Sequence, residues 1–275
     1  MKKNYVCGCD VGSTYGKAAI MNLDGDVLGT SIIRSKIDPE KTSVLSVEEA
    51  IRNCDARYGI KGLGDFTYIL GTGYGRNRVP FAEENISEIT CHAMGVHVTD
   101  PNVRTVVDIG GQDMKGISVD ADGSVRHFAM NDKCAAGTGR FFESMIRAFE
   151  VDFDEFSAMS LRAKQIVPIT SQCSVFAESE VVSLVAQKKD PADIAAGIQA
   201  AVAKRCFTML KSAGVEREVT MTGGCAKNLG LKKALERILR FDLVQLATDP
   251  QLMGSLGAAE FARRKVLAKA KDAAV

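Results

Sequence analysis

Two segments of this 275-residue chain combine an aspartate with a glycine-containing turn, and these residue types bind magnesium and phosphate. The first segment is Asp10-Val-Gly-Ser-Thr and the second is Asp108-Ile-Gly-Gly-Gln-Asp. Each aspartate follows an apolar run that predicts a buried strand. The glycines let the N–H groups of a turn approach an anion, and a carboxylate at the strand end can hold a magnesium-bound water. We therefore expect two phosphate-binding loops.

The first loop offers further donors, and a third glycine turn occurs later in the chain. Ser13 and Thr14 carry hydroxyl groups, and Lys17 adds a positive charge, although a position on the following strand can turn it away from the ligand. The third turn, Met221-Thr-Gly-Gly-Cys-Ala, lies between a predicted strand at 219–221 and a predicted helix. Its glycine backbone suits a ribose or purine. The absence of a G-x-x-x-x-G-K-[ST] sequence excludes a P-loop.

A shared pattern surrounds the two aspartates. In each copy a lysine, Lys17 or Lys115, follows the aspartate by seven positions, and an Asp-Gly pair follows it by fourteen. An Asp-Gly pair between β-rich runs predicts a hairpin, so each copy has the order strand, glycine turn, strand, Asp-Gly turn, strand. We expect an α/β fold of two duplicated halves, at 1–103 and 104–275, that face each other across a nucleotide cleft.

Helical periodicity appears between and after these strands. The predicted helices span 46–58, 86–98, 140–150, 174–187, 191–213, 228–239 and 248 to the C-terminus. Ser46, followed three positions later by Glu49, forms a capping-box pattern that predicts the start of the first helix. His92, His97 and His127 lack the spacing of metal ligands and are interpreted as surface or satisfied core residues.

The composition is that of an ordinary folded chain. Hydrophobic residues make up 46% and charged residues 25%, which excludes disorder or a coiled coil as the main content. The 35 Lys and Arg residues balance 34 Asp and Glu residues, so the net charge of +1 indicates neither nucleic-acid nor membrane-surface binding. No apolar run reaches the ~18 residues of a membrane helix, and the N-terminus lacks a signal core. We expect a cytoplasmic protein.

Eight cysteines are present, but no pair has the Cys-x-x-Cys spacing. A zinc knuckle or a ferredoxin-type cluster within one chain is therefore not indicated, and most of these cysteines are interpreted as small buried hydrophobes. Cys134 and Cys173 differ because each lies at or just before a predicted helix N-terminus, where the thiolate is favoured. Since a 4Fe-4S cluster needs four thiolates, two chains related by a twofold axis could share one. Alternatively, either cysteine is simply buried.

The duplicated segments and the late Gly-Gly turn, in this order, resemble the superfamily of acetate and sugar kinases, heat-shock chaperone ATPases and actin. The resemblance extends over nearly the whole chain. Four strings narrow it: TGYGR at 72–76, SEITCHAMG at 87–95, NDKCAAGTGRF at 131–141 and VFAESEV at 175–181. They resemble the BadF/BadG/BcrA/BcrD ATPase family, which includes the activator ATPases (component A) of 2-hydroxyacyl-CoA dehydratases and the ATP-binding subunits of benzoyl-CoA reductase.

This resemblance implies a function, cofactors and partners. In the family a homodimer holds one bridging 4Fe-4S cluster through two cysteines of each subunit, which map to Cys134 and Cys173. Ferredoxin or flavodoxin supplies an electron, and ATP binding and hydrolysis with magnesium drive it at low potential to a partner iron–sulfur dehydratase or reductase. Cys7, Cys9 and Cys225 stand where relatives usually carry aliphatic residues, and we interpret them as core substitutions.

The same resemblance implies the roles of the site residues. Asp10 and Asp108 position magnesium through water, and either Gln112 or Asp113 orients the attacking water. Gln251, near the last helix, borders the adenine. The expected nucleotide contacts are Gly12, Ser13, Thr14, Tyr15, Gly16, Lys17, Gly110, Gly111, Gln112, Gly223, Gly224, Cys225, Ala226 and Gln251.

Three alternatives stay open at the level of sequence. A reductase component for a benzoyl-CoA reductase-like or double-cluster protein would carry the same features. A small-molecule kinase of the same fold would use Asp113 as the base for a substrate hydroxyl, but it would not need two cysteines at helix starts. A non-catalytic actin-like or chaperone-like module would leave the string at 131–141 unexplained.

Overall fold

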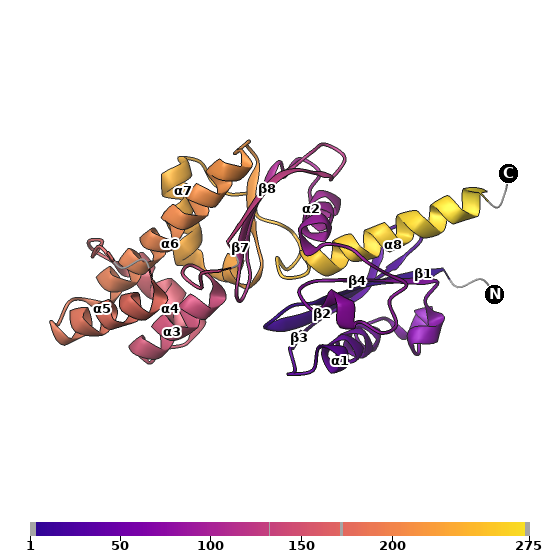
Figure 1. Cartoon of the computed structure of the whole chain (residues 1–275), viewed down its shortest axis with the longest axis horizontal. Helices are drawn as coiled ribbons and strands as arrows, with labels where there is room; N and C mark the ends of the chain where they lie inside the picture. Colours follow the sequence, from indigo (N-terminus) through magenta and orange to yellow (C-terminus); the bar gives the residue numbers. More distant parts are fainter. Residues whose placement is uncertain (1–3, 132, 171–172, 273–275) are drawn as a thin grey trace. The chain divides into compact units, whose positions relative to one another are not determined.

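The computed structural model of the chain describes residues 4–131, 133–170 and 173–272 and divides into two compact units (Figure 1). Unit 1 holds the described residues up to Asn102, together with Val119–Val125 and those from Leu246 onward; unit 2 holds Val103–Ser118 and Arg126–Gln245. The C-terminal helix thus belongs to unit 1, whereas the sequence indicated a second half spanning all of 104–275. The reason is that this helix packs on the first sheet.

Unit 1 is built on a five-stranded sheet with the order β3-β2-β1-β4-β5. Its strands are β1 (Tyr5–Val11), β2 (Tyr15–Asn22), β3 (Val27–Arg34), β4 (Tyr68–Thr72) and β5 (Glu84–Asn85). The first three form an antiparallel meander, and β4 pairs with β1 in parallel. The predicted Asp-Gly turn joins β2 to β3, with Gly25 at a φ of 101°, a conformation that suits glycine.

Helices cover both faces of this sheet, which explains why β1 is almost wholly buried (Figure 1). The helices of unit 1 are α1 (Pro39–Arg52), α2 (Glu88–Thr99) and α8 (Met253–Asp272). Successive side chains of a strand point to opposite faces. Accordingly, Cys9 Sγ lies 3.8 Å from Ser43 O of α1, while a Cβ at Gly8 would lie only 2.1 Å from Ser255 O of α8. Gly8 therefore lets α8 approach the sheet closely.

Unit 2 repeats this topology. Its strands are β6 (Thr105–Ile109), β7 (Met114–Val119), β8 (Val125–Asn131) and β9 (Val219–Thr222). Their order, β8-β7-β6-β9, matches β3-β2-β1-β4, with β6 antiparallel to β7 and parallel to β9. The predicted α/β fold with two duplicated halves is therefore confirmed.

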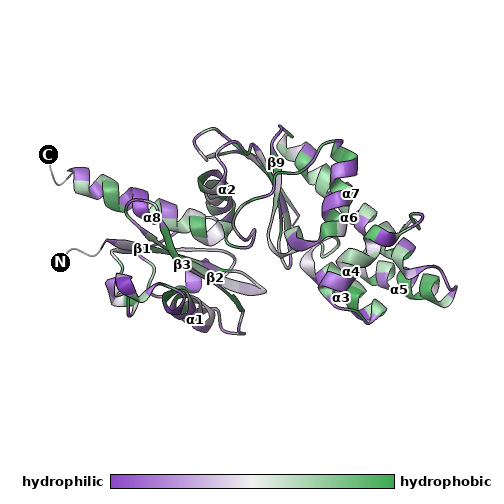
Figure 2. Cartoon of the chain, turned by 180° about the vertical axis from the view of Figure 1, so that it is seen from behind, coloured by the Kyte–Doolittle hydropathy of each residue, from purple (hydrophilic) through white to green (hydrophobic). Residues whose placement is uncertain are grey.

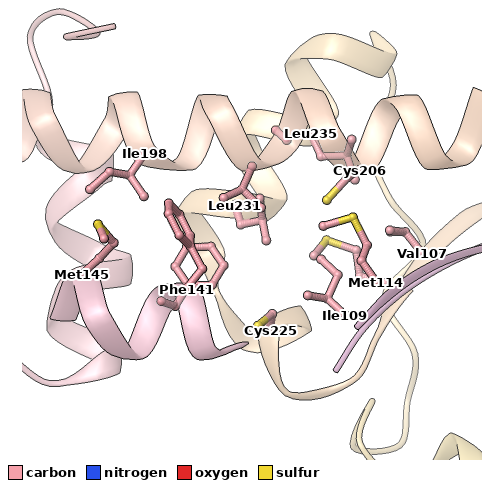
Figure 3. Packing of buried hydrophobic residues seen from close by; sticks show 14 of the residues in the cluster. Val107, Ile109, Met114, Phe141, Met145, Ile198, Cys206, Cys225, Leu231 and Leu235 are labelled. Atoms are coloured by element: carbon pink, nitrogen blue, oxygen red, sulfur yellow. The ribbon is translucent and has the colours of Figure 1, made fainter. Parts of the chain in front are cut away.

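One apolar core holds the helices of unit 2 on their sheet (Figure 3). These helices are α3 (Gly139–Phe149), α4 (Phe153–Met159), α5 (Ser174–Ala186), α6 (Pro191–Ala213) and α7 (Leu229–Leu239). Phe141 and Met145 of α3 lie near Ile198 of α6, and Met114 of β7 reaches the same cluster. Burying each such side chain stabilises the fold by about 1.5–3 kcal/mol.

The structure corrects two helix predictions. α1 begins at Pro39, because Asp38 caps it by accepting a hydrogen bond from Glu40 N (3.0 Å) and proline suits the first helical position. Ser46, the predicted start, is buried in mid-helix and donates to Thr42 O (2.8 Å). The seven-residue α4 was not predicted, since it is too short to show a helical period.

Short 3-10 turns complete the described chain, at Ala56–Tyr58, Leu63–Asp65, Arg76–Arg78, Ser160–Arg162 and Gly224–Lys227. None of the helices in the described residues is both long enough and apolar enough to cross a membrane.

Candidate functional site

In unit 1, the aspartate near the end of β1 forms an ion pair with a lysine on β2. Asp10 and Lys17 face each other in the antiparallel register, and Lys17 Nζ lies 2.8 Å from Asp10 Oδ2. The Asp10 side chain is 3% exposed and that of Lys17 is 12% exposed. Lys17 Nζ also donates to Tyr15 O at 3.2 Å, so the lysine points back to the glycine turn and not away from it.

Glycines surround the Asp10 carboxylate where a side chain would not fit. A Cβ at Gly73, whose φ is 91°, would lie 2.4 Å from Asp10 Oδ1, and a Cβ at Gly254 would lie 2.5 Å from Oδ2. The Cβ at Gly254 would also lie 3.0 Å from His92 Nε2, so this buried α2 histidine lies beside the carboxylate. The sequence favoured a surface or core role for His92, since it lacks the spacing of a metal ligand. Its place beside Asp10 depends on how α2 and α8 pack.

The turn between β1 and β2 keeps its polar residues at the surface. Gly12 N donates to Tyr15 O at 3.1 Å, which closes the turn, while Ser13 is exposed and Thr14 is half-buried. Gly16, in contrast to Ser13 and Thr14, faces the interior, because a Cβ there would lie 2.4 Å from Ser46 Oγ of α1. Gly16 thus serves the packing of α1 on the sheet, and Ser13 and Thr14 have the hydroxyls placed to meet a ligand.

In unit 2, the equivalent lysine contacts two carboxylates. Lys115 on β7 faces Asp108 on β6, with Nζ 3.4 Å from Asp108 Oδ2 and 2.7 Å from Asp113 Oδ2. Thr222 Oγ1 on β9 donates to Asp108 Oδ1 at 2.8 Å. Lys115 and Asp108 are both almost completely buried. Neither Lys115 nor Thr222 was a predicted site residue; the shared seven-residue spacing of the lysines was the signal for Lys115.

The second glycine turn folds its own aspartate inward. Gly110 N donates to Asp113 O at 3.0 Å, and a Cβ at Gly110 would lie 2.4 Å from Asp113 Oδ1. Gln112 is exposed, and Gly111 is half-buried beside it. The loop therefore presents Gln112 outward and directs the carboxylate of Asp113 toward buried Lys115.

The third glycine turn, after β9, buries its cysteine. Gly223 has a φ of 80°, and a Cβ there would lie 2.3 Å from Ile109 O, so only glycine fits. Cys225 is 3% exposed and belongs to the core cluster in Figure 3, where burial raises the pKa of its thiol. The Cys225 side chain thus belongs to the core, while its neighbours in the sequence, Gly224 and Ala226, are half-buried. The buried Gln251 lies in unit 1.

The Asp10 carboxylate has the free acceptor capacity that a magnesium-bound water requires. Asp10 Oδ2 is buried and lies 2.8 Å from Lys17 Nζ, and a carboxylate with one such partner keeps lone pairs for a further donor. Asp108 differs, because Thr222 donates to its Oδ1 and Lys115 lies beside its Oδ2. Asp10 therefore fits magnesium better than Asp108 does.

Two of the eight cysteines are exposed, and they are Cys134 and Cys173. The partly buried or buried ones are Cys7, Cys9, Cys54, Cys91, Cys206 and Cys225. Burial raises the pKa of both Cys91 and Cys206 to about 12, which keeps these thiols protonated and inert. The interpretation of Cys7, Cys9 and Cys225 as core residues is confirmed by their burial.

The two exposed cysteines differ in their relation to the helices. Cys173 is the N-cap residue of α5, and its carbonyl accepts from Ala177 N at 2.9 Å, as predicted for a cysteine at a helix start. The helix predicted at 140–150 is α3, which begins at Gly139, but Cys134 lies in the loop before it and does not cap it. Near them, Asp132, Ser171 and Gln172 lie outside the described residues.

The first N–H groups of α3 are used by the glycine loop of unit 2. Gly139 N donates to Gly110 O and Arg140 N donates to Gly111 O, both at 2.9 Å. These bonds satisfy donors that a helix start otherwise leaves without partners. Cys134 is held instead by the Asn131 side chain, whose Nδ2 donates to Cys134 O at 3.0 Å.

The cysteines fit an iron–sulfur cluster only as half of a ligand set. Among the described residues, no group of three or more His, Cys, Asp or Glu side chains is arranged to hold a metal ion. A 4Fe-4S cluster takes four thiolates. Two exposed cysteines per chain match a cluster shared by two chains, and the remaining cysteines are partly or wholly buried.

Several exposed apolar side chains follow Cys173 along α5. Val175 and Phe176 are both 68% exposed, and Val182 and Val185 also face solvent. Figure 2 shows hydrophobic residues along this helix. Exposed apolar residues grouped in this way are typical of a protein–protein interface.

Comparison with known proteins identifies the family. The model of the BadF/BadG/BcrA/BcrD ATPase family matches residues 7–262. The "Activator of lactoyl-CoA dehydratase" of Anaerotignum propionicum is 40% identical over 94% of this chain and 97% of that protein. The structure of the activator of the 2-hydroxyisocaproyl-CoA dehydratase from Clostridium difficile with bound ADPNP has a TM-score of 0.89 and 38% identity, covering 98% of this chain and 97% of that one.

The comparisons also confirm the fold class. A ROK family glucokinase from Streptomyces griseus, 14% identical over 94% of this chain and 99% of the kinase chain, has a TM-score of 0.53 and therefore shares the fold alone. The two duplicated halves thus have the same overall fold as this kinase. Because the family model spans most of the sequence, the chain belongs to the BadF/BadG/BcrA/BcrD ATPase family.

Proposed function

We propose that this protein is an ATPase that delivers a low-potential electron to a partner iron–sulfur enzyme, a 2-hydroxyacyl-CoA dehydratase. The observation that carries the proposal is that Cys134 and Cys173 are exposed while the other cysteines are partly or wholly buried. Both belong to the unit that also carries the Asp108 loop. Relatives that are dehydratase activators support this partner class.

The glycine turns supply the contacts to ATP. Ser13 and Thr14 donate their hydroxyls to the phosphates together with turn N–H groups, and Lys17 balances the phosphate charge. The turn from Gly223 to Ala226 lies under the nucleoside, with Gly224 and the backbone of Cys225 taking part, and Gln251 borders the base. Asp10 holds magnesium through water, with Asp108 as the corresponding carboxylate of unit 2; when bound, the ion neutralises phosphate charge.

Gln112 orients the attacking water. Asp113, the alternative, has its carboxylate 2.7 Å from Lys115 and folded under the loop, so it is a poor general base. Gln112 lies at the exposed tip of the same loop. The engaged carboxylate also disfavours a small-molecule kinase, which would need Asp113 as the base for a substrate hydroxyl.

Two copies of the chain hold one 4Fe-4S cluster, which supplies one-electron transfer when bound. Cys134 and Cys173 of each copy are its ligands, and the apolar face of α5 beside Cys173 supports contact with a second protein surface. Ferredoxin or flavodoxin is the proposed donor. For one electron, a tenfold change in an equilibrium constant corresponds to about 59 mV, so a few kcal/mol of coupling to ATP changes the driving force by on the order of 100 mV.

Purification without oxygen tests this function. A dimer with about four irons per two chains is expected, because one cluster takes four thiolates. Cys134→Ala and Cys173→Ala should each lose this iron, whereas Cys206→Ala, which changes a buried core cysteine, should keep it. Full iron in both single variants would show that the ligand assignment is wrong, and a colourless protein that phosphorylates an added sugar would support a kinase.

A further inference from the structure

Two backbone hydrogen bonds in unit 2 connect the Gly110–Gly111 turn to α3. We infer that these bonds, from Gly139 N to Gly110 O and from Arg140 N to Gly111 O, couple the state of the nucleotide to the two exposed cysteines. Both bonds measure 2.9 Å. The inference rests on the proposed function, since it assumes that ATP binds this turn and that the cysteines hold a cluster.

The turn and the helix meet backbone to backbone, which makes the contact stiff. A Cβ at Gly139 would lie 3.1 Å from Gly111 Cα and 3.2 Å from Gly110 O, tighter than an ordinary contact. No side chain lies between them to absorb a movement. Since a backbone N–H group buried without a partner is costly, a turn that shifts around ATP takes the first residues of α3 with it.

From the start of α3, hydrogen bonds lead back to Cys134. Thr138, the N-cap residue of α3, donates to Ala135 O from both its N–H group (3.0 Å) and its Oγ1 (2.7 Å). Ala135 is bonded covalently to Cys134. On the other side, Asn131 Nδ2 donates to Cys134 O, and Cys134 N donates to Asn131 Oδ1 at 3.3 Å. Cys134 is therefore held between the end of β8 and the start of α3.

Packing extends the same connection to Cys173. α3 packs against α5, the helix that Cys173 caps. Phe141 and Phe142 of α3 and Ala177 and Val181 of α5 are buried in one cluster. Because protein interiors are close-packed, displacement of one helix is passed to the other. A shift at Gly139 thus reaches both cysteines of a protomer.

The test uses the anaerobically purified holoprotein and compares the rates at which an iron chelator removes iron in the presence of ADP and of ATP. For the wild type we expect the two rates to differ. Gly139→Ala should keep iron content and ATP affinity but reduce the ratio of the two rates by about threefold or more. Alanine favours a helix, so the variant should fold, yet its methyl group pushes the turn away from α3.

A second variant and a matched control separate the outcomes. Thr138→Val removes the hydroxyl bond to Ala135 at nearly constant shape and should weaken the response in the same direction. Gly62→Ala, where nothing lies within 4 Å of the added Cβ, should behave as the wild type. A wild-type ratio retained in both Gly139→Ala and Thr138→Val overturns the coupling route alone. Equal rates with ADP and ATP in the wild type overturn the route together with the proposed coupling of ATP to the cluster.

Discussion

Lys17 Nζ lies 2.8 Å from Asp10 Oδ2 across the first two strands of unit 1. The corresponding Lys115 in unit 2 lies 3.4 Å from Asp108 and closer, at 2.7 Å, to a second carboxylate on Asp113. The duplicated halves thus keep the same ion pair but differ in what surrounds it. In unit 1 the lysine pairs with one carboxylate, and in unit 2 it also pairs with the loop's own aspartate.

The buried carboxylate of Asp10 next to the first glycine turn predicts that this residue makes ATP binding depend on magnesium. Asp10→Asn should reduce ATP hydrolysis by about 100-fold or more, the usual cost of removing one electrostatic group from an active site. Calorimetry should show that magnesium no longer changes the affinity for ATP. Asp24→Asn, at an exposed hairpin of the same unit, should leave the rate of ATP hydrolysis and the effect of magnesium on ATP affinity unchanged. Magnesium dependence that survives Asp10→Asn would contradict the assignment.

Because Gln112 is exposed and Asp113 is paired with Lys115, substitutions at the two positions should have different effects. Gln112→Ala should lower the rate of ATP hydrolysis by about 10²-fold with little change in ATP affinity, because the lost group acts on the attacking water. Asp113→Asn should lower the melting temperature, since the buried Lys115 loses an ion-pair partner. Single-turnover hydrolysis and thermal unfolding separate the two. If Asp113→Asn unfolds as the wild type does but cannot hydrolyse ATP, Asp113 is the catalytic residue.

Local patterns made the duplicated core predictable. The glycine turn at Gly12 and the seven-residue spacing from Asp10 to Lys17 specify a hairpin whose register brings these residues face to face. The same spacing recurs from Asp108 to Lys115. Hairpin geometry depends on a few neighbouring residues, so the sequence alone carries it.

Features that depend on distant packing were not predictable. The membership of α8 in unit 1 follows from its contact with β1 and α2, which are far away in the sequence. The position of His92 beside Asp10 depends on the close approach at Gly254. The start of α1 is a different case, because Asp38 and Pro39 form a local signal that the capping-box pattern at Ser46 concealed.

A half-buried arginine next to the Cys134 turn predicts an effect on the reduction potential. Arg205 Cδ lies 3.5 Å from where a Cβ at Gly137 would be, and its guanidinium carbon lies 6.0 Å from the centre of the Phe141 ring. Burial lowers the pKa of Arg205, and interaction with Cys134 opposes this effect. A positive charge near a cluster stabilises its reduced, more negative state.

Arg205→Met should therefore make the proposed cluster harder to reduce, by on the order of tens of mV, since about 59 mV corresponds to a tenfold change for one electron. A redox titration followed by electron paramagnetic resonance measures this potential. Lys204→Met removes the same charge from an exposed position next to it on α6 and should cause a smaller change. Equal shifts in the two variants would mean that the location of Arg205 has no special effect.

The C-terminal helix carries a carboxylate whose pKa ties stability to pH. Glu260 is 4% exposed and accepts hydrogen bonds from Arg263 Nε and Arg264 Nε, both at 2.7 Å. Burial alone would raise the pKa of Glu260, but the bonds from the two arginines outweigh it, and the pKa lies below its ordinary value. A carboxylate with a lowered pKa stabilises the folded state above its unfolded pKa of about 4.3 and loses this contribution as pH falls through the folded pKa.

Glu260→Gln should therefore lower the free energy of unfolding by about 1.5–3 kcal/mol at pH 7, the range for hydrogen bonds to charged groups. As pH falls below about 4, the wild type loses this stabilisation by protonation, so its difference from the variant should shrink. Urea unfolding at several pH values measures both effects. Glu48→Gln, an exposed change on α1, should have little effect at any pH. A deficit in Glu260→Gln that stays constant from pH 7 to acid would show that the side chain acts through packing and not through its charge.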